Sequence, residues 1–185
     1  VKEQYAVNFD SPVAINNAYS RLPIGCINAA GAAAMALGVL RAATDELIEL
    51  CAARITPGKN PDLRDRATVQ GAIAKSKTLL AALRAQLHAS VNTLWEASQH
   101  HNIFTDHQLA EVWAASGEAA RAARAMVSEI YAVAGTASLY KKHKIERAHR
   151  DIHAILQHGI LQPHWLEQAG GVYVGLTPTS AMFRI

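Results

Sequence analysis

One apolar stripe between residues 62 and 100 constrains this chain more than any other feature. Its members recur at spacings of three, four and seven: Val69, Ile73, Leu80, Leu83, Leu87, Val91 and Leu94. This is the period of a helix that buries one side. The stripe therefore predicts a long helix from Asp62 or Leu63 to His100.

Short breaks divide the rest of the chain into three further helices and a short fifth one. "TPGKNPD" (56–62) and "HHNIFTD" (100–106) are breaks, "AGTAS" (134–138) is a turn, and "GILQP" (159–163) ends another segment. The predicted helices span 23–54, 106–134 and 144–158, with Asp106 as a cap, and Pro163 opens a last helix to Val174.

Long helices joined by short connections predict an all-α fold, an up-down-up-down four-helix bundle. Half of the residues are hydrophobic but only 6% are aromatic, so the core consists of Ala, Leu, Ile and Val, which suits closely packed helices. The expected organisation is an extended segment over 1–22, the bundle over 23–175 and a loose tail over 176–185.

The uncharged run "PIGCINAAGAAAMALGVL" (23–40) is long enough to raise the question of a membrane span. Ala and Gly dominate it, Asn28 interrupts it, and it continues into the amphipathic "RAATDELIEL", so it predicts a buried helix and no membrane. Cys26 and Cys51 lie in this apolar region without metal-ligand spacing, which indicates buried, reduced thiols in a cytoplasmic protein.

Charge and histidine patterns give few functional signals. The net charge is only +3, and the basic residues are not interleaved with stacking aromatics, so nucleic-acid binding is not expected. His149 and His153 have a spacing that can bind zinc, but no third ligand is fixed by the sequence, so no metal site is predicted and a solvated face is preferred.

The segment "RAHRDIHAILQH" (147–158) places Ile145, Ala148, Ile152, Ile155 and Leu156 on one apolar arc of a helix. Arg147 and Asp151 form an i,i+4 pair on another arc. His158 stands at the predicted helix end, where the helix dipole alone could account for it. Periodicity and composition therefore lead to a helical bundle and name no reaction.

Four segments resemble the C-terminal helical domain of the acyl-CoA dehydrogenase superfamily: "CAARITPG", "TVQGAIAKSKTLLAALRAQL", "YAVAGTASLY" and "IERAHRDIHAILQHGILQP". The resemblance covers residues 20–175. It implies that an N-terminal helical domain and a middle β-domain belong to the parent protein and are absent here, so this chain alone is not expected to be a competent enzyme or to bind flavin tightly.

Within that superfamily, the end of this helix distinguishes two branches. The common dehydrogenases carry a glutamate base at the slot that corresponds to Gly159, so the base is missing. His158 followed by Gly159 resembles the two-component flavin-dependent monooxygenases, which include phenol and hydroxysteroid hydroxylases. In that branch, a separate reductase supplies reduced FMN or FAD, and O2 converts it to a C4a-hydroperoxyflavin that hydroxylates an aromatic or similar substrate.

The resemblance also implies roles for individual residues. His158 would be catalytic and contact the flavin, since an imidazole can donate to a peroxide or accept from a phenol. Gly159 would leave room for the flavin ring, and Thr136 and Ala137 would line it. Arg54 would reach the flavin of a neighbouring subunit, although "ITPG" follows it where many dehydrogenases have Gln-Phe-Gly.

Two alternatives remain open. One is an acyl-CoA dehydrogenase or nitroalkane-oxidase-like FAD oxidoreductase with its base elsewhere. The other is a non-catalytic helical oligomerisation module. In every case we expect a homo-oligomer, with a tetramer favoured, and for the enzymes a small-molecule substrate.

Overall fold

Three long helices and two short ones form the chain in a computed structural model that describes residues 15–53, 62–101 and 103–185. The long helices are α1 (Ile24–Ala53), α2 (Ala67–Gln99) and α3 (Asp106–Ala134), and the short ones are α4 (Lys144–Ile155) and α5 (Pro163–Tyr173). The described residues contain no strand, and the all-α bundle expected from the sequence is confirmed.

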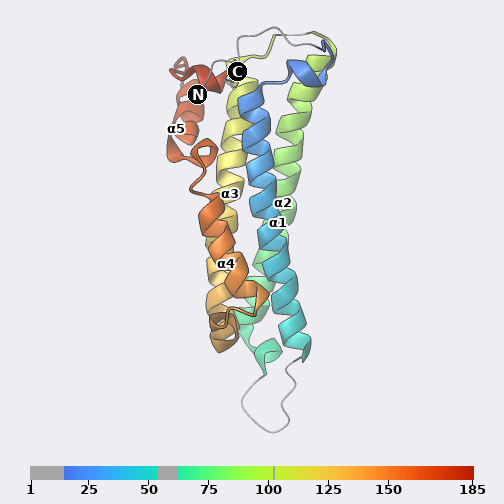
Figure 1. Cartoon of the computed structure of the whole chain (residues 1–185), viewed down its shortest axis with the longest axis vertical. Coiled ribbons are helices and arrows are strands. Elements are labelled where there is room, and N and C mark those ends of the chain that lie inside the picture. The colour runs from blue at the N-terminus through green and yellow to red at the C-terminus, as the bar shows by residue number, and fades with distance from the viewer. Residues whose placement is uncertain (1–14, 54–61, 102) are drawn as a thin grey trace, which may run out of the picture.

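The fourth position of the bundle is shared by two helices in succession. α1 and α3 run antiparallel to α2, while α4 packs along one half of α3 and α5 along the other half (Figure 1). A short 3-10 turn over Gly159–Leu161 joins them. The predicted fourth helix to His158 is therefore too long, because it ends at Ile155 and His158 caps the following turn.

The predicted apolar stripes form the core. Val69, Leu80, Leu87 and Leu94 of α2 are buried. The α3 residues predicted to point inward are all buried as well: Leu109, Val112, Trp113, Ala120, Met126, Val127 and Ile130. In the middle of the bundle, buried Thr44 and Ser76 join α1 to α2, with 2.5 Å between their hydroxyl oxygens.

α1 is long and apolar enough to cross a membrane by length and composition alone. It contributes Leu37, Leu40 and Leu47 to the core and packs against α2, α3 and α4, as the central helix of a bundle does. Cys26 and Cys51 are buried free thiols, as expected. Burial raises the pKa of Cys26 to about 12.

The cap of α3 differs from the prediction by one residue. Thr105, not Asp106, is the N-cap, because its hydroxyl accepts the N–H of Gln108 while the Gln108 side chain accepts the N–H of Thr105. This is a capping box. Asp106, the first helical residue, instead accepts two hydrogen bonds from Arg184 at 2.7 and 2.6 Å.

The tail after Leu176 is not loose, contrary to the prediction. Phe183 is fully buried, and its carbonyl accepts the indole N–H of Trp113 at 3.2 Å. Trp113 stacks on Trp165 of α5 with 4.2 Å between ring centroids. These rings form a second apolar cluster at the end of the bundle where α1 begins. Residues 19–21 also depart from the expected extended segment, since they form a 3-10 turn.

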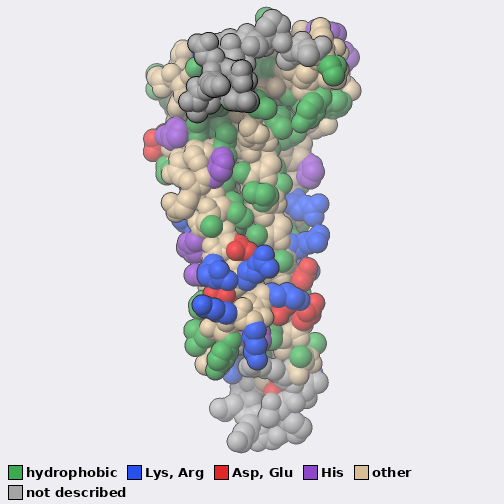
Figure 2. Space-filling model, in the orientation of Figure 1, with side chains coloured by type: hydrophobic (Ala, Val, Ile, Leu, Met, Phe, Trp, Pro, Cys, Tyr) green, Lys and Arg blue, Asp and Glu red, His purple; other side chains and the backbone are tan. Residues whose placement is uncertain are grey.

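Charged side chains gather in the other half of the molecule. On the face that Figure 2 shows, most of the acidic and basic side chains lie in the half of the view away from α5, whereas hydrophobic and histidine side chains occur in both halves. On this face, one half of the bundle therefore carries more charged side chains than the other.

Candidate functional site

His158 lies at the junction between α4 and α5, beside a surface hollow of about 630 Å³. The walls come from the end of α4 and from the first turns of α1. They comprise Ile27, Asn28, Gly31, Ala32, Met35, Ala154, Ile155 and His158. Small and apolar side chains therefore form most of the hollow, and Asn28 and His158 are its polar groups.

The orientation of His158 is set by its own turn. Its Nδ1 accepts the backbone N–H of Ile160 at 3.2 Å. A ring nitrogen that accepts a hydrogen bond carries no proton, so the neutral imidazole holds its proton on Nε2. The imidazole is exposed, and its Nε2–H is the group available for donation. Of the two roles expected for His158, this geometry favours the donor over the acceptor.

Two side chains hold the turn that carries His158. The indole N–H of Trp165 donates to the carbonyl of Gly159 at 2.8 Å. The amide of Gln162 donates to the carbonyls of Leu156 at 3.2 Å and His158 at 3.4 Å. Since Trp165 also stacks in the second apolar cluster, the position of the turn depends on the docking of α5.

Gly159 leaves open space beside His158. A Cβ built on Gly159 would meet no atom within 4 Å. The approach of a flavin ring to this space stays a prediction. The backbone φ of Gly159 is not positive, whereas Gly135 at the end of α3 has a φ of 65°. Gly159 is therefore not required by backbone conformation.

The other expected site residues lie elsewhere in the chain. Thr136 is exposed in the turn after α3, and the twelve residues of α4 separate it from the junction, a rise of about 18 Å. Ala137 lies in the same turn. Arg54 falls outside the described residues. One flavin ring cannot contact both Thr136 and His158 of a single chain, so these assignments remain predictions that require an extended cofactor or a second copy.

The two histidines of α4 differ in exposure, although both were expected to lie on a solvated face. His153 is exposed, but His149 is half-buried, with its ring 4.5 Å from Tyr131 and 4.8 Å from His153 between centroids. Burial and the neighbouring His153 lower the pKa of His149. No group of three metal-ligating side chains occurs among the described residues.

The charged pairs of α4 support the helix. Arg147 contacts Asp151 at 3.3 Å, as its spacing predicted, and Arg150 donates to Glu146 at 2.8 Å. Both pairs are exposed on their arginine side, so each contributes little to stability. They do not line the hollow.

Sequence reasoning missed the α1 wall of the hollow. Asn28, Gly31 and Met35 were interpreted only as part of a buried helix, yet all three are exposed. The available signal was the absence of charge on every face of residues 23–40. A helix with a buried stripe normally has a charged opposite face, and its absence indicates a second surface to cover.

Comparison with known proteins identifies the relatives of this domain. Residues 30–163 match the family model described as "Acyl-CoA dehydrogenase, C-terminal domain". Indole-3-acetate monooxygenase of Pseudomonas putida is 28% identical over 146 residues, which are 77% of this chain and 36% of that protein. The chain thus spans about a third of the length of this relative.

Solved structures share the fold. 3-HSA hydroxylase from Rhodococcus sp. matches with a TM-score of 0.81 at 19% identity, over 89% of this chain and 43% of that one. XiaF from Streptomyces sp., solved in complex with FADH2 and glycerol, matches with a TM-score of 0.78 at 23% identity, over 86% and 41%. The family model covers most of the chain, and these structures have the same architecture. The chain belongs to the acyl-CoA dehydrogenase C-terminal domain family.

Proposed function

We propose that this chain is the C-terminal helical domain of a flavin-dependent monooxygenase that hydroxylates an aromatic or similar small molecule. The observation that carries the proposal is His158, which lines an apolar hollow and directly precedes Gly159, the slot at which the dehydrogenase branch would keep a glutamate. The relative with monooxygenase in its name is similar over 77% of this chain, and this supports the same branch.

The hollow fits a flavin ring but not a flavin phosphate. Its small and apolar walls and the open space beside Gly159 suit a flat ring. No Lys or Arg of the described ranges lines it, so a phosphate would need partners from outside it, such as Arg54 of another copy. A bound reduced flavin, FMN or FAD, would supply the activation of O2 that hydroxylation requires.

His158 then acts as a hydrogen-bond donor through Nε2. The backbone N–H of Ile160 keeps Nδ1 unprotonated, so the imidazole presents its proton to an oxygen atom in the hollow. A positioned donor stabilises negative charge that develops on oxygen in a site with little water. Ile27, Met35 and Ile155 line the hollow and would help to exclude water from the reacting atoms once the other domains of the parent protein cover it.

We further propose a cytoplasmic homotetramer that receives reduced flavin from a separate reductase. Long helices with an uncharged outer face on α1 suit burial against other parts of the assembly. Light scattering of the full-length protein measures the oligomer. If flavin that has been reduced chemically supports hydroxylation without any reductase, the reductase serves only as the source of reduced flavin.

The test compares His158 variants of the full-length protein, with indole-3-acetate as the first substrate probe. We expect His158→Ala to lower hydroxylated product about 100-fold and to release more H2O2 for each reduced flavin consumed. His158→Gln keeps an N–H donor and should retain part of the activity. His153→Ala is the matched control, because it removes an exposed imidazole near the end of α4 that does not line the hollow.

Normal coupling of flavin oxidation to product in His158→Ala would remove His158 from the mechanism. Bleaching of bound FAD by an acyl-CoA or a nitroalkane, without O2, would instead favour a dehydrogenase or oxidase. Failure of the full-length protein to bind any flavin would leave only an oligomerisation module.

A further inference from the structure

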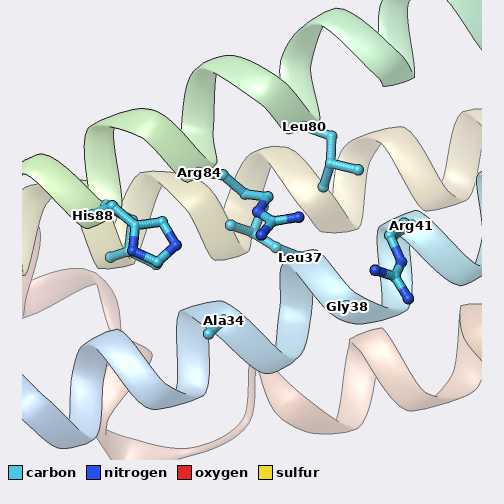
Figure 3. Close-up of a pocket in the computed structure, with 8 residues that line it drawn as sticks. Ala34, Leu37, Gly38, Arg41, Leu80, Arg84 and His88 are labelled. Carbon is cyan, nitrogen blue, oxygen red and sulfur yellow. The ribbon is translucent and has the colours of Figure 1, made fainter.

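A second hollow lies between α1 and α2, on a different side of α1 from His158. It has a volume of about 310 Å³, which is at the lower end for small-molecule sites. Leu37 of α1 and Leu80 and Leu87 of α2 form its floor, and each of them is buried. Figure 3 shows the two helices with Arg84 and His88 reaching from α2 into the space above α1.

The polar side chains that line this groove are basic. Arg41, Arg84 and His88 line it, and no carboxylate from the described part of the chain does. Among the described residues, no acidic side chain pairs with Arg84. Arg41 approaches only Asp45, at 4.0 Å, and Asp45 is shared with Lys77 at 3.5 Å. The groove therefore combines an apolar floor with uncompensated positive charge.

Some arginines of this chain are neutralised by a carboxylate. Arg147, Arg150 and Arg184 each contact one within 3.3 Å. Arg84 instead lies across the leucine floor. Its guanidinium has five N–H donors, and no carboxylate of the described residues pairs with it. A planar guanidinium recognises carboxylate or phosphate oxygens with two parallel hydrogen bonds.

We propose that the groove binds a small amphipathic anion, with a flat apolar body over Leu37, Leu80 and Leu87 and a carboxylate or phosphate at Arg84. Arg41 adds attraction at the other side of the groove. This site is separate from the hollow at His158, where no Lys or Arg of the described ranges is in the lining, and it does not depend on the function proposed above. The two hollows open on neighbouring parts of α1.

Two probes of the same shape test the proposal, namely 2-naphthoate and its neutral counterpart 2-naphthamide. Each is titrated into the 15N-labelled 185-residue chain. We expect naphthoate to shift the amide signals of Leu37–Arg41 and Leu80–His88, and to bind about tenfold more tightly than naphthamide, the preference that one charge-assisted hydrogen bond gives. Arg84→Gln should remove most of this preference and leave naphthamide binding unchanged.

Arg124→Gln is the matched control, because Arg124 is exposed on α3 and does not line the groove. It should leave both affinities unchanged. Equal affinity of the wild-type chain for the two probes would overturn the proposal, as would shifts confined to the hollow at His158. Concentration-dependent shifts of the same amides without any probe, unaffected by naphthoate, would show that a second copy covers the groove and would also overturn it.

Discussion

The buried hydroxyl pair between α1 and α2 gives a sharp test of how the core is held. Thr44 donates to the carbonyl of Leu40 at 2.8 Å, and its oxygen lies 2.5 Å from that of Ser76. Because the Thr44 proton is already used, Ser76 must be the donor within the pair. Both residues are fully buried.

The two single substitutions should therefore differ. Thr44→Val leaves the Ser76 hydroxyl buried without an acceptor, which costs about 2 kcal/mol. Ser76→Ala removes the donor while Thr44 keeps its bond to Leu40, which costs about 1 kcal/mol. The double variant leaves no unpaired hydroxyl, so its stability should lie within about 1 kcal/mol of wild type.

Urea unfolding followed by circular dichroism measures these differences as shifts of the midpoint at constant slope. For a chain of this length, 1 kcal/mol corresponds to about 2–4 °C in Tm, so Thr44→Val should melt about 4–8 °C lower. The double-mutant cycle then gives a favourable coupling of about 2 kcal/mol. If Thr44→Val costs no more than Ser76→Ala, Ser76 finds another acceptor and the reasoning is wrong.

Three further outcomes follow from the ends of α1 and α3. Gly25→Ala should loosen the tail and lower Tm by several degrees in a thermal melt, because a Cβ there would lie 2.5 Å from the carbonyl of Met182. Thr105→Ala should destabilise the fold by about 1 kcal/mol in urea, since it removes half of the capping box. The Arg184 hydrogen bond lowers the pKa of Asp106, so this contact stabilises the fold above the ordinary carboxyl pKa and is lost as pH falls through the lowered one. Arg184→Gln should therefore destabilise the protein at neutral pH, and its effect should shrink as pH falls through the lowered pKa of Asp106, as acid titration of stability will show.

Local patterns in the sequence predicted the long helices well. The stripe of α2 and the inward face of α3 are each decided by residues three and four positions apart, and packing of such a stripe supplies most of the stability of a helix in a folded protein. The boundaries at Ile24, Asp106 and Pro163 follow from proline and polar residues at the starts. These signals act within one or two turns, so a sequence carries them directly.

Contacts between distant segments could not be predicted in the same way. Phe183 lies in a polar, proline-containing tail, and its burial depends on Trp113, seventy residues earlier. The early end of α4 has the same origin, because Ile155 and His158 continue the helical pattern but Trp165 and Gln162 hold the turn that follows. His158 itself was found from its resemblance to a family, whereas its tautomer required the hydrogen bond from Ile160.

The division of the fourth bundle position has a consequence for motion. α4 and α5 are separate short helices, and the hydrogen bond from Trp165 ties the turn between them to the second apolar cluster. Helices of this length are marginal on their own, so α5 depends on its packing in the second apolar cluster, and we expect it to open more readily than the three long helices. Hydrogen exchange would then report two stabilities within one domain. The imidazole of His158 sits at the boundary between the two units, and so its alignment is governed by the weaker one.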